Sequence, residues 1–477
     1  MGAFICQVSD KDWPRSREKG VYGNRENRPD GSAPLRLQDR LSVIRDLISI
    51  RPRDLMFFHV VGKEFGPSAL YGPYQARSMP YYDRSPVWDN SLEGFPFRVL
   101  FEPLSGYEAL CSDNFSITIS ALYAAIESRK IWSLATLENE RNIEKRAVRK
   151  ISQEDARTIL NLFWRELPIR LPTALWETAH MLQPTSSFAP MRNQIREVGR
   201  YENAIKALLM HKLADRDDSC LSIFPNYVDF VNETFVAPIT RKLMDILVVS
   251  RSNGDARHYY IMQAETDKFT FTDLNQLLQY IDLFRQRPVF NRQTDNISAC
   301  ALAVNFDDDT VRFRDLHAHF CPYDQVMLVT YEPNSSGTDA RLAQLSAGAL
   351  RRVPIRRETI SVHIWGSASP RSDVVQKASA NLPFYTESRH MTRNLKEQVD
   401  DNSFIIEENS AEDGSLIKIY FVSVLDGVLS RVACLADYDF RVIAPVIICR
   451  HFDEATLEYT SMWQALSVRR PIALYQY

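Results

Sequence analysis

Carboxylate and amide side chains on two neighbouring predicted strands are the group in this chain best suited to chemistry. Asp245 lies within one apolar run, and Gln263 and Glu265 close the next. The polar segment 250–255 between the runs is typical of a turn, so a β-hairpin is predicted. Side chains two residues apart on a strand share a face, which places Gln263 beside Glu265. Converging oxygen ligands could hold Mg²⁺, whereas the simpler interpretation makes Asp245 and Glu265 ordinary charges at strand ends.

Two predicted helices must position these side chains. Apolar residues between 198 and 209 recur at helical intervals and predict an amphipathic helix that turns Glu202 inward. Leu274, Leu277, Leu278 and Ile281 have the same periodicity and predict a second helix, which carries Gln276 and Tyr280. The order along the chain is therefore helix, hairpin, helix, with polar residues on each.

This ordered set resembles the core of the PD-(D/E)XK nucleases. The family pattern is an acid, then an acidic residue or Gln, any residue, and a Lys. Asp245 and Gln263 match the first two positions. Glu265 stands where the family usually has Lys, as in a minority of restriction-type members. Gln276 and Tyr280 resemble a Gln-xxx-Tyr pair that follows the core in some of these nucleases.

The resemblance implies a role for each residue and a divalent cation, Mg²⁺ or Mn²⁺. Asp245 and Glu265 would bind the metal together with the carbonyl of Ala264. Gln263 and Glu202 would orient metal or water. Since Lys is missing from the third position, water would be activated by Glu265 or by the metal itself.

Length and charge set broad limits on this interpretation. A chain of 477 residues predicts two to four domains. The net charge of −3 does not favour nucleic-acid binding, but a local patch rather than the overall sum contacts phosphate. Basic residues cluster at 15–19, 141–150 and 351–357, although such runs are more often solvated faces.

Cysteine usage and hydropathy favour a cytoplasmic protein. The seven cysteines are scattered without CxxC spacing, which predicts reduced, mostly buried thiols. No apolar run has the length of a membrane span, and the N-terminus does not have the pattern of a signal peptide. No membrane partner is expected.

The first 163 residues alternate short apolar strands with aromatic-rich loops. Strands are predicted at 4–8, 55–61, 71–76 and 95–101, with polar loops at 12–24 and 81–88. Helices are predicted near 41–48 and from Ser152 to Phe163, with Ser152 as N-cap. This succession resembles the EVE and YTH domains, which are PUA-like β-barrels that read modified bases.

The resemblance implies a cage for a flipped base. Tyr22 after Gly-Val and Trp88 after Ser-Pro occupy the positions of two cage walls, and Asp12 stands where YTH readers usually have Asn. Trp13 is included in the predicted base site. Stacking on aromatic faces contributes about 1–3 kcal/mol per base, and polar groups read the base edge. The plain alternative is that these aromatics are core or surface residues.

The fold class predicted for the whole chain is α/β (α+β). A PUA-like barrel at 1–163 and a linker at 164–192 precede a nuclease-like mixed sheet flanked by helices at 193–335. The segment 340–477 matches no family and could complete the nuclease sheet, dimerise or contact DNA.

The sequence thus predicts a modification-dependent DNA endonuclease of restriction type. Its partner would be double-stranded DNA carrying methylated or hydroxymethylated cytosine, or methyladenine. A homodimer is expected, because cutting both strands needs two active sites. The alternative is a catalytically degenerate reader of modified DNA or RNA that does not cleave. An RNA-directed nuclease differs from the main prediction only in substrate.

Overall fold

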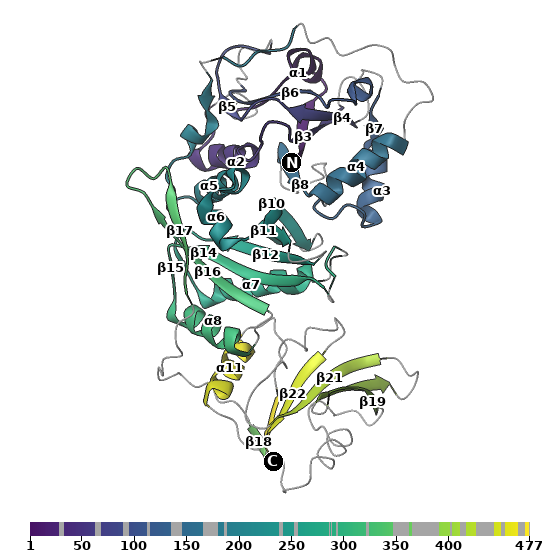
Figure 1. Cartoon of the computed structure of the whole chain (residues 1–477), viewed down its shortest axis with the longest axis vertical. Coiled ribbons are helices and arrows are strands. Elements are labelled where there is room, and N and C mark those ends of the chain that lie inside the picture. Colours follow the sequence, from purple (N-terminus) through teal and green to yellow (C-terminus); the bar gives the residue numbers. More distant parts are fainter. Residues whose placement is uncertain are drawn as a thin grey trace.

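The computed structural model describes most of the chain up to residue 346 and selected elements beyond it (Figure 1). Before 346 the exceptions are 28–32, 63–67, 89–94, 112–114, 135–145, 166–179, 186–187, 238–241, 252–255, 286, 288, 292–293 and 321–323. After 346 the described segments are 362–364, 391–400, 403–410, 416–425, 443–449, 454–465 and 473–476. Three large sheets follow one another along the longest axis of the molecule.

A nine-stranded sheet forms the N-terminal half in the order β8-β1-β3-β4-β6-β5-β9, with β2 paired to β6 and β7 to β4. Its strands are β1 (Ala3–Ser9), β2 (Val21–Asn24), β3 (Leu55–Val61), β4 (Ala69–Ala76), β5 (Tyr81–Tyr82), β6 (Phe97–Pro103), β7 (Ile117–Thr118), β8 (Val148–Ile151) and β9 (Ala189–Pro190). β1 runs parallel to β3, and the other pairs are antiparallel. The four strands predicted from sequence in this half are confirmed within a few residues.

Four α-helices accompany this sheet: α1 (Trp13–Lys19), α2 (Leu37–Leu47), α3 (Ile119–Glu127) and α4 (Gln153–Arg165). Short 3₁₀ helices lie at Glu108–Cys111 and Met191–Gln194. The predicted cap of α4 is confirmed, because Ser152 Oγ accepts the N–H of Asp155 at 3.1 Å. The loop predicted at 12–24 is wrong. Pro14 in the first turn and Gly20 at φ +58° begin and end α1 there, and a Cβ on Gly20 would lie 2.7 Å from the carbonyl oxygen of Phe101.

The middle of the chain forms a six-stranded mixed sheet in the order β10-β11-β12-β14-β16-β17. Its strands are β10 (Tyr227–Ala237), β11 (Lys242–Arg251), β12 (Arg257–Ala264), β14 (Asn296–Ala303), β16 (Asp324–Pro333) and β17 (Ala340–Gln344). β10, β11 and β12 are antiparallel neighbours, β12, β14 and β16 are parallel, and β17 is antiparallel at the edge. The hairpin predicted around residues 250–255 is confirmed. β17 extends this sheet. Residues 340–344, which were predicted as the start of the C-terminal segment, therefore belong to the middle sheet.

Helices cover both faces of the middle sheet. They are α5 (Glu202–Asp215), α6 (Asp218–Ile223), α7 (Phe271–Phe284) and α8 (Asp308–Phe320), and a small sheet joins β13 (Lys268–Phe269) to β15 (Asn305–Phe306). α5 packs on one face beside Ile246 and Met262. α7 packs on the other beside Leu247 and Ile261. Alternate residues of each strand are thus buried under opposite helices, as its period of two requires.

The N-terminal half and the middle sheet share one hydrophobic core. Side chains of α2, such as Leu41, and of β3, such as Phe58, belong to the same buried cluster as Leu208 of α5. The predicted linker packs where it is described: β9 pairs with β5, and the N–H of Leu182 donates to the carbonyl of Lys19 at 2.9 Å. The described residues up to 346 therefore form two large sheets that share a common core.

The third sheet has the order β18-β23-β22-β21-β20-β19. Its strands are β18 (Val362–Ile364), β19 (Met391–Asp400), β20 (Ser403–Ser410), β21 (Leu416–Leu425), β22 (Ile443–Cys449) and β23 (Ala473–Gln476). These strands form a sheet of their own and do not complete the middle one. Helix α11 (Glu454–Ala465) packs on α8, where Arg312 bonds Glu458 at 2.6 and 2.7 Å. None of the described helices is long and apolar enough to cross a membrane.

Candidate functional site

Strands β11 and β12 part at Asp245. Their ladder ends at the pair Ile246–Met262, while β11 continues to pair with β10 as far as Lys242. Oδ2 of Asp245 accepts the N–H of Ala264 at 2.7 Å, beyond the last rung. The N–H of Ala264 on β12 thus bonds the buried carboxylate of Asp245, and not a backbone carbonyl of β11.

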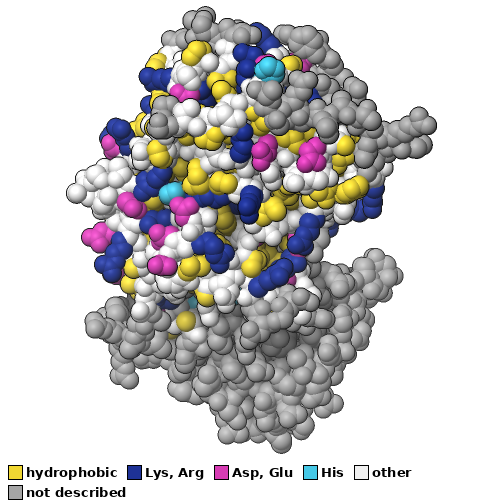
Figure 2. Space-filling view, turned by 45° about the horizontal axis from the view of Figure 1, so that its top comes forward, with side chains coloured by type: hydrophobic (Ala, Val, Ile, Leu, Met, Phe, Trp, Pro, Cys, Tyr) yellow, Lys and Arg dark blue, Asp and Glu magenta, His cyan; other side chains and the backbone are white. Residues whose placement is uncertain are grey.

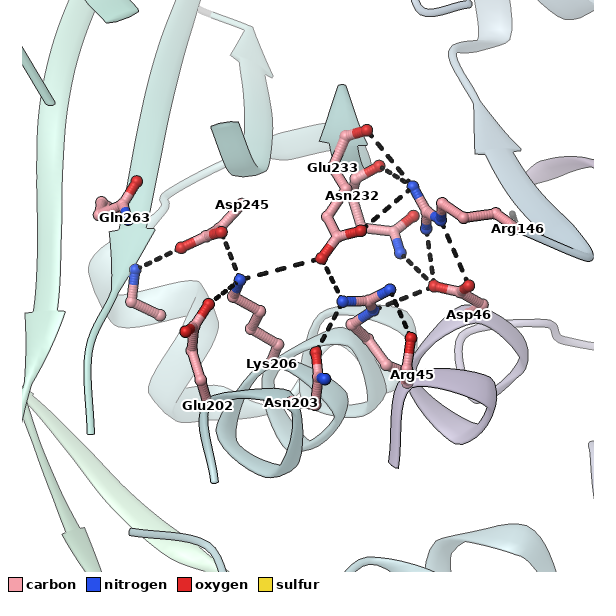
Figure 3. Close-up of polar contacts among 12 residues, drawn as sticks. Arg45, Asp46, Arg146, Glu202, Asn203, Lys206, Asn232, Glu233, Asp245 and Gln263 are labelled. Carbon is pink, nitrogen blue, oxygen red and sulfur yellow. Dashed lines mark hydrogen bonds and ion pairs between the residues drawn. The ribbon is translucent and has the colours of Figure 1, made fainter. Parts of the chain in front are cut away.

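A lysine from helix α5 meets Asp245 at this point (Figure 3). The ammonium of Lys206 bonds Oδ1 of Asp245 and also the carboxylate of Glu202, one helical turn earlier on α5. The Lys206 side chain is 5% exposed and that of Asp245 is 8% exposed, so both charges are largely removed from water. Burial raises the pKa of Asp245 above its ordinary value, although the Lys206 ammonium opposes this. Burial alone would lower the pKa of Lys206, but the surrounding carboxylates raise it.

The predicted Gln-x-Glu pair lies together at the end of β12. Nε2 of Gln263 donates to Oε1 of Glu265 at 3.3 Å, which places both side chains on one face as predicted. Oε1 of Gln263 is buried and has no hydrogen-bond partner among the described residues. The pKa of Glu265 is raised, first by burial and also by the charges of Glu202 and Asp245. These three carboxylates therefore share one electrostatic environment.

Glu202 and the α7 pair complete the predicted set. Glu202 is the first residue of α5, so the helix begins later than the apolar spacing predicted, and its side chain is 42% exposed. On α7, Gln276 donates to the hydroxyl of Tyr280. The pKa of Tyr280 is raised by burial and by the nearby charges of Asp245 and Glu265. Five of the six residues predicted as catalytic thus interact by contact or by charge around the point where β11 and β12 part, whereas Gln276 is exposed and contacts Tyr280.

The donor set suits a hard cation only in part. Among the described residues, no three His, Cys, Asp or Glu side chains are close enough to hold a metal ion. Mg²⁺, however, commonly binds through one or two carboxylates and keeps several waters. Asp245 and Glu265 offer carboxylates, and the unpartnered amide oxygen of Gln263 offers a neutral ligand. Two carboxylates and one amide oxygen are thus the donors that a divalent cation could use here, although both oxygens of Asp245 already have protein partners.

The predicted base cage is not formed by the residues assigned to it. Tyr22 is 1% exposed and packs in the common core, where its hydroxyl donates to the carbonyls of Ala147 at 2.9 Å and Gln7 at 3.2 Å. Trp88 belongs to a separate cluster with Val21, the strand neighbour of Tyr22. Because adjacent residues of a strand point to opposite faces, Tyr22 and Trp88 do not face each other.

The other two residues of the predicted base site also have structural partners. Trp13 is 7% exposed and its ring lies 4.9 Å from that of Phe58. Asp12 precedes α1, and its carboxylate accepts the hydroxyl of Ser9 at 2.6 Å. The three aromatic residues assigned to the cage, Trp13, Tyr22 and Trp88, are therefore buried in hydrophobic clusters. This agrees with the plain alternative that they are core residues.

The basic clusters are mostly engaged in local contacts. Arg146 and Lys150 are buried, and Arg15 pairs with Glu18 at 2.8 Å. Residues 141–145 and 351–357 lie outside the described residues. On the face shown in Figure 2, Lys and Arg side chains are interspersed with Asp and Glu over the described part of the surface. No broad basic stripe is visible on that part of this face.

Sequence reasoning missed Lys206 and Glu233. Lys206 had a signal: it is the charged residue within the apolar run Ala204–Met210 and follows Glu202 by one helical turn. Glu233 had none, because its partners come from segments distant in the sequence. Asn232 and Thr234 pair with Ile246 and Met244, which places Glu233 across from Asp245.

Comparisons with known proteins give distant likenesses. No family model and no curated protein matches the chain. One similar structure is a hypothetical protein from Leishmania major, with a TM-score of 0.24, 11% identity, and coverage of 35% of this chain and 96% of the other. A Pseudomonas putida protein has a TM-score of 0.22, 11% identity and coverage of 34% and 99%. Human THYN1, solved in complex with 5-methylcytosine containing DNA, has a TM-score of 0.21, 10% identity and coverage of 35% and 100%. At these values the likenesses do not assign a family.

Proposed function

We propose that this protein hydrolyses phosphodiester bonds in double-stranded DNA that carries a modified base, at the site formed by Glu202, Lys206, Asp245, Gln263 and Glu265. The observation that carries the proposal is the position of Lys206. The nuclease resemblance lacks its usual lysine at position 265, and a lysine from α5 contacts the first acid of the motif instead. The helix–hairpin–helix order of α5, β11, β12 and α7 supports the same assignment.

Each side chain has a chemical role in this proposal. A divalent cation, when bound, would act as a Lewis acid and lower the pKa of water. Asp245, Glu265 and the amide oxygen of Gln263 would hold it. The Lys206 ammonium, which stays protonated, would stabilise negative charge that develops on the phosphate. Burial raises the pKa of Glu265, and its carboxylate would either hold the cation or accept a proton from water.

The N-terminal half would supply recognition of the base. This part of the proposal rests on the EVE and YTH resemblance of the sequence, with the contact residues left to be found outside the Tyr22 position. Phosphate contacts add affinity without sequence information.

A non-cleaving reader is the second candidate, and one observation favours it. The Lys206 ammonium already pairs with Asp245 and Glu202, which compensates the acids without a metal. In a degenerate site such a pairing would persist and exclude a cation.

Digestion of modified DNA separates the two candidates. Plasmids carrying 5-methylcytosine, 5-hydroxymethylcytosine or N6-methyladenine are incubated with the full chain and Mg²⁺, beside unmodified plasmid and EDTA controls. Nicking or cutting that needs both Mg²⁺ and a modification supports the proposal. If the wild type binds modified DNA but leaves every plasmid intact in Mg²⁺ and Mn²⁺, the reader is correct.

A further inference from the structure

Glu233 of β10 lies across from Asp245 and has an unusual backbone. Its φ is +45°, in a region that residues with a side chain seldom adopt. Such a conformation costs about 1–3 kcal/mol and persists where surrounding contacts hold it. The side chain is 8% exposed, so its charge needs compensation within the protein.

The carboxylate of Glu233 contacts three cationic groups (Figure 3). Arg45 of α2 donates to its Oε1, and Nη1 of Arg146 lies 3.7 Å from its Oε2. The ammonium of Lys206 lies 3.9 Å from Oε1. Oε1 is thus shared between Arg45, which belongs to the N-terminal half, and Lys206, which belongs to the candidate active site.

The two arginines are themselves held firmly. Asp46 accepts from Arg45 at 3.0 Å and from Arg146 at 2.7 Å, and Nδ2 of Asn232 donates to it at 3.1 Å. Nη1 of Arg45 also donates to Asn203 of α5 at 2.7 Å. These contacts connect α2, the segment before β8, β10 and α5 into one buried polar network. The position of Glu233 is therefore set by the N-terminal half.

We propose that Glu233 is a positioning residue of the active site, which holds the Lys206 ammonium against Asp245 and fixes it to Arg45 and Arg146 of the N-terminal half. The inference rests on the proposed function for its catalytic meaning. The Glu233 carboxylate would thus tie the ammonium of the candidate site to two guanidinium groups of the N-terminal half, and its loss would release Lys206. The coupling itself is a property of the fold and can be measured without catalysis.

Asp46 provides a matched control. Like Glu233, it is a buried carboxylate bonded by both Arg45 and Arg146, but only Glu233 of the two is in contact with Lys206. Glu233→Gln and Asp46→Asn should both destabilise the fold.

The kinetic test compares the two variants as folded protein at matched concentration. Glu233→Gln should lower kcat about tenfold or more and keep KM for DNA within about twofold. Asp46→Asn should leave kcat within about twofold. Glu233→Asp keeps the charge and should recover part of kcat. Equal losses of kcat in Glu233→Gln and Asp46→Asn would contradict a positioning role.

A double-mutant cycle tests the coupling in the full chain by urea unfolding. Arg45→Met and Lys206→Met are made singly and together, in the wild type and in the Glu233→Gln background. If the shared carboxylate couples the two groups, the effects of Arg45→Met and Lys206→Met on the unfolding equilibrium constant should be non-additive by about fivefold or more. In the Glu233→Gln background this non-additivity should disappear. Additive effects in the wild-type background would overturn the inference. If the wild type cuts no DNA, the proposed function fails while this cycle still decides whether Glu233 links the two groups.

Discussion

Replacing Lys206 with Met should expose how much of the fold depends on the site charges. Of the three carboxylates around Lys206, Glu202 is 42% exposed, so its pair contributes about 0–1 kcal/mol. Glu233 lies 3.9 Å away and keeps Arg45. Asp245 is the acid that loses its cationic partner while it stays buried. Removing one partner of a buried pair costs about 3–5 kcal/mol, and the retained Ala264 N–H favours the lower end.

Urea unfolding followed by circular dichroism measures this cost. At pH 8 we expect Lys206→Met to lose about 3 kcal/mol of unfolding free energy. The double variant Lys206→Met/Asp245→Asn replaces the pair by neutral groups and should recover to within about 1–2 kcal/mol of the wild type. A loss below about 1 kcal/mol, or a double variant no more stable than Lys206→Met, would refute the buried ion pair.

The same variant should show a distinctive pH dependence. The pKa of Asp245 is already raised by burial, and loss of the ammonium raises it further. A carboxyl whose folded pKa exceeds its unfolded value binds a proton more readily when folded, so unfolding free energy increases as pH falls through the folded pKa. The deficit of Lys206→Met should therefore shrink between pH 8 and pH 5, and a constant deficit would contradict the explanation.

Three further outcomes follow from the described contacts. Asp245→Asn should reduce Mg²⁺-dependent cleavage by about 10²-fold or more, because a charged ligand is worth several kcal/mol, while DNA affinity in a binding assay with EDTA stays within about threefold. Tyr22→Phe should cost about 1 kcal/mol in urea unfolding through loss of its hydroxyl bonds, yet leave the ratio of modified to unmodified DNA affinity unchanged; a collapse of that ratio would restore the cage. Burial raises the pKa of Asp155 to about 6 from an ordinary 3.8, so its share of stability, up to about 3 kcal/mol, should be lost as pH rises from 4 to 6. Asp155→Asn should flatten that part of the unfolding free energy measured against pH.

Local patterns predicted the parts of the fold that depend on local physics. The β11–β12 hairpin, helix α7 and the strands of the N-terminal half follow from apolar periodicity and turn residues, and they are confirmed. Gln263 and Glu265 also lie on one face of their strand, as their spacing predicted, while their catalytic role stays a prediction. Helix α1 was not predicted because its seven residues are too few and too polar to show an apolar period. Its two ends are set by Pro14 and Gly20.

Contacts between distant segments were beyond the reach of these patterns. Tyr22 and Trp88 have the residue types of a cage, but β2, paired with β6, turns Tyr22 into the common core, whereas Trp88 packs with Val21. The pairing of Lys206 with Asp245 joins α5 to β11, and no short spacing in the sequence predicts it. Glu233 is more remote still, since Arg45 and Arg146 approach it from elements about 188 and 87 residues away.

The charges around the candidate site do not balance, and this imbalance predicts how the site should respond to a divalent cation. Five carboxylates, those of Asp46, Glu202, Glu233, Asp245 and Glu265, surround three cationic groups, Arg45, Arg146 and Lys206. Two formal negative charges remain, and the raised pKa values of Asp245 and Glu265 favour uptake of protons there. A divalent cation would compensate the same charges, so its binding should displace protons. Titration calorimetry with Mg²⁺ or Mn²⁺, at the lowest pH at which the protein stays folded and in buffers of different ionisation enthalpy, should detect proton release in the wild type, whereas Asp245→Asn should show a smaller release. If Asp245→Asn binds the cation as tightly as the wild type, with the same proton release, Asp245 is not a ligand and its assignment to the metal is wrong.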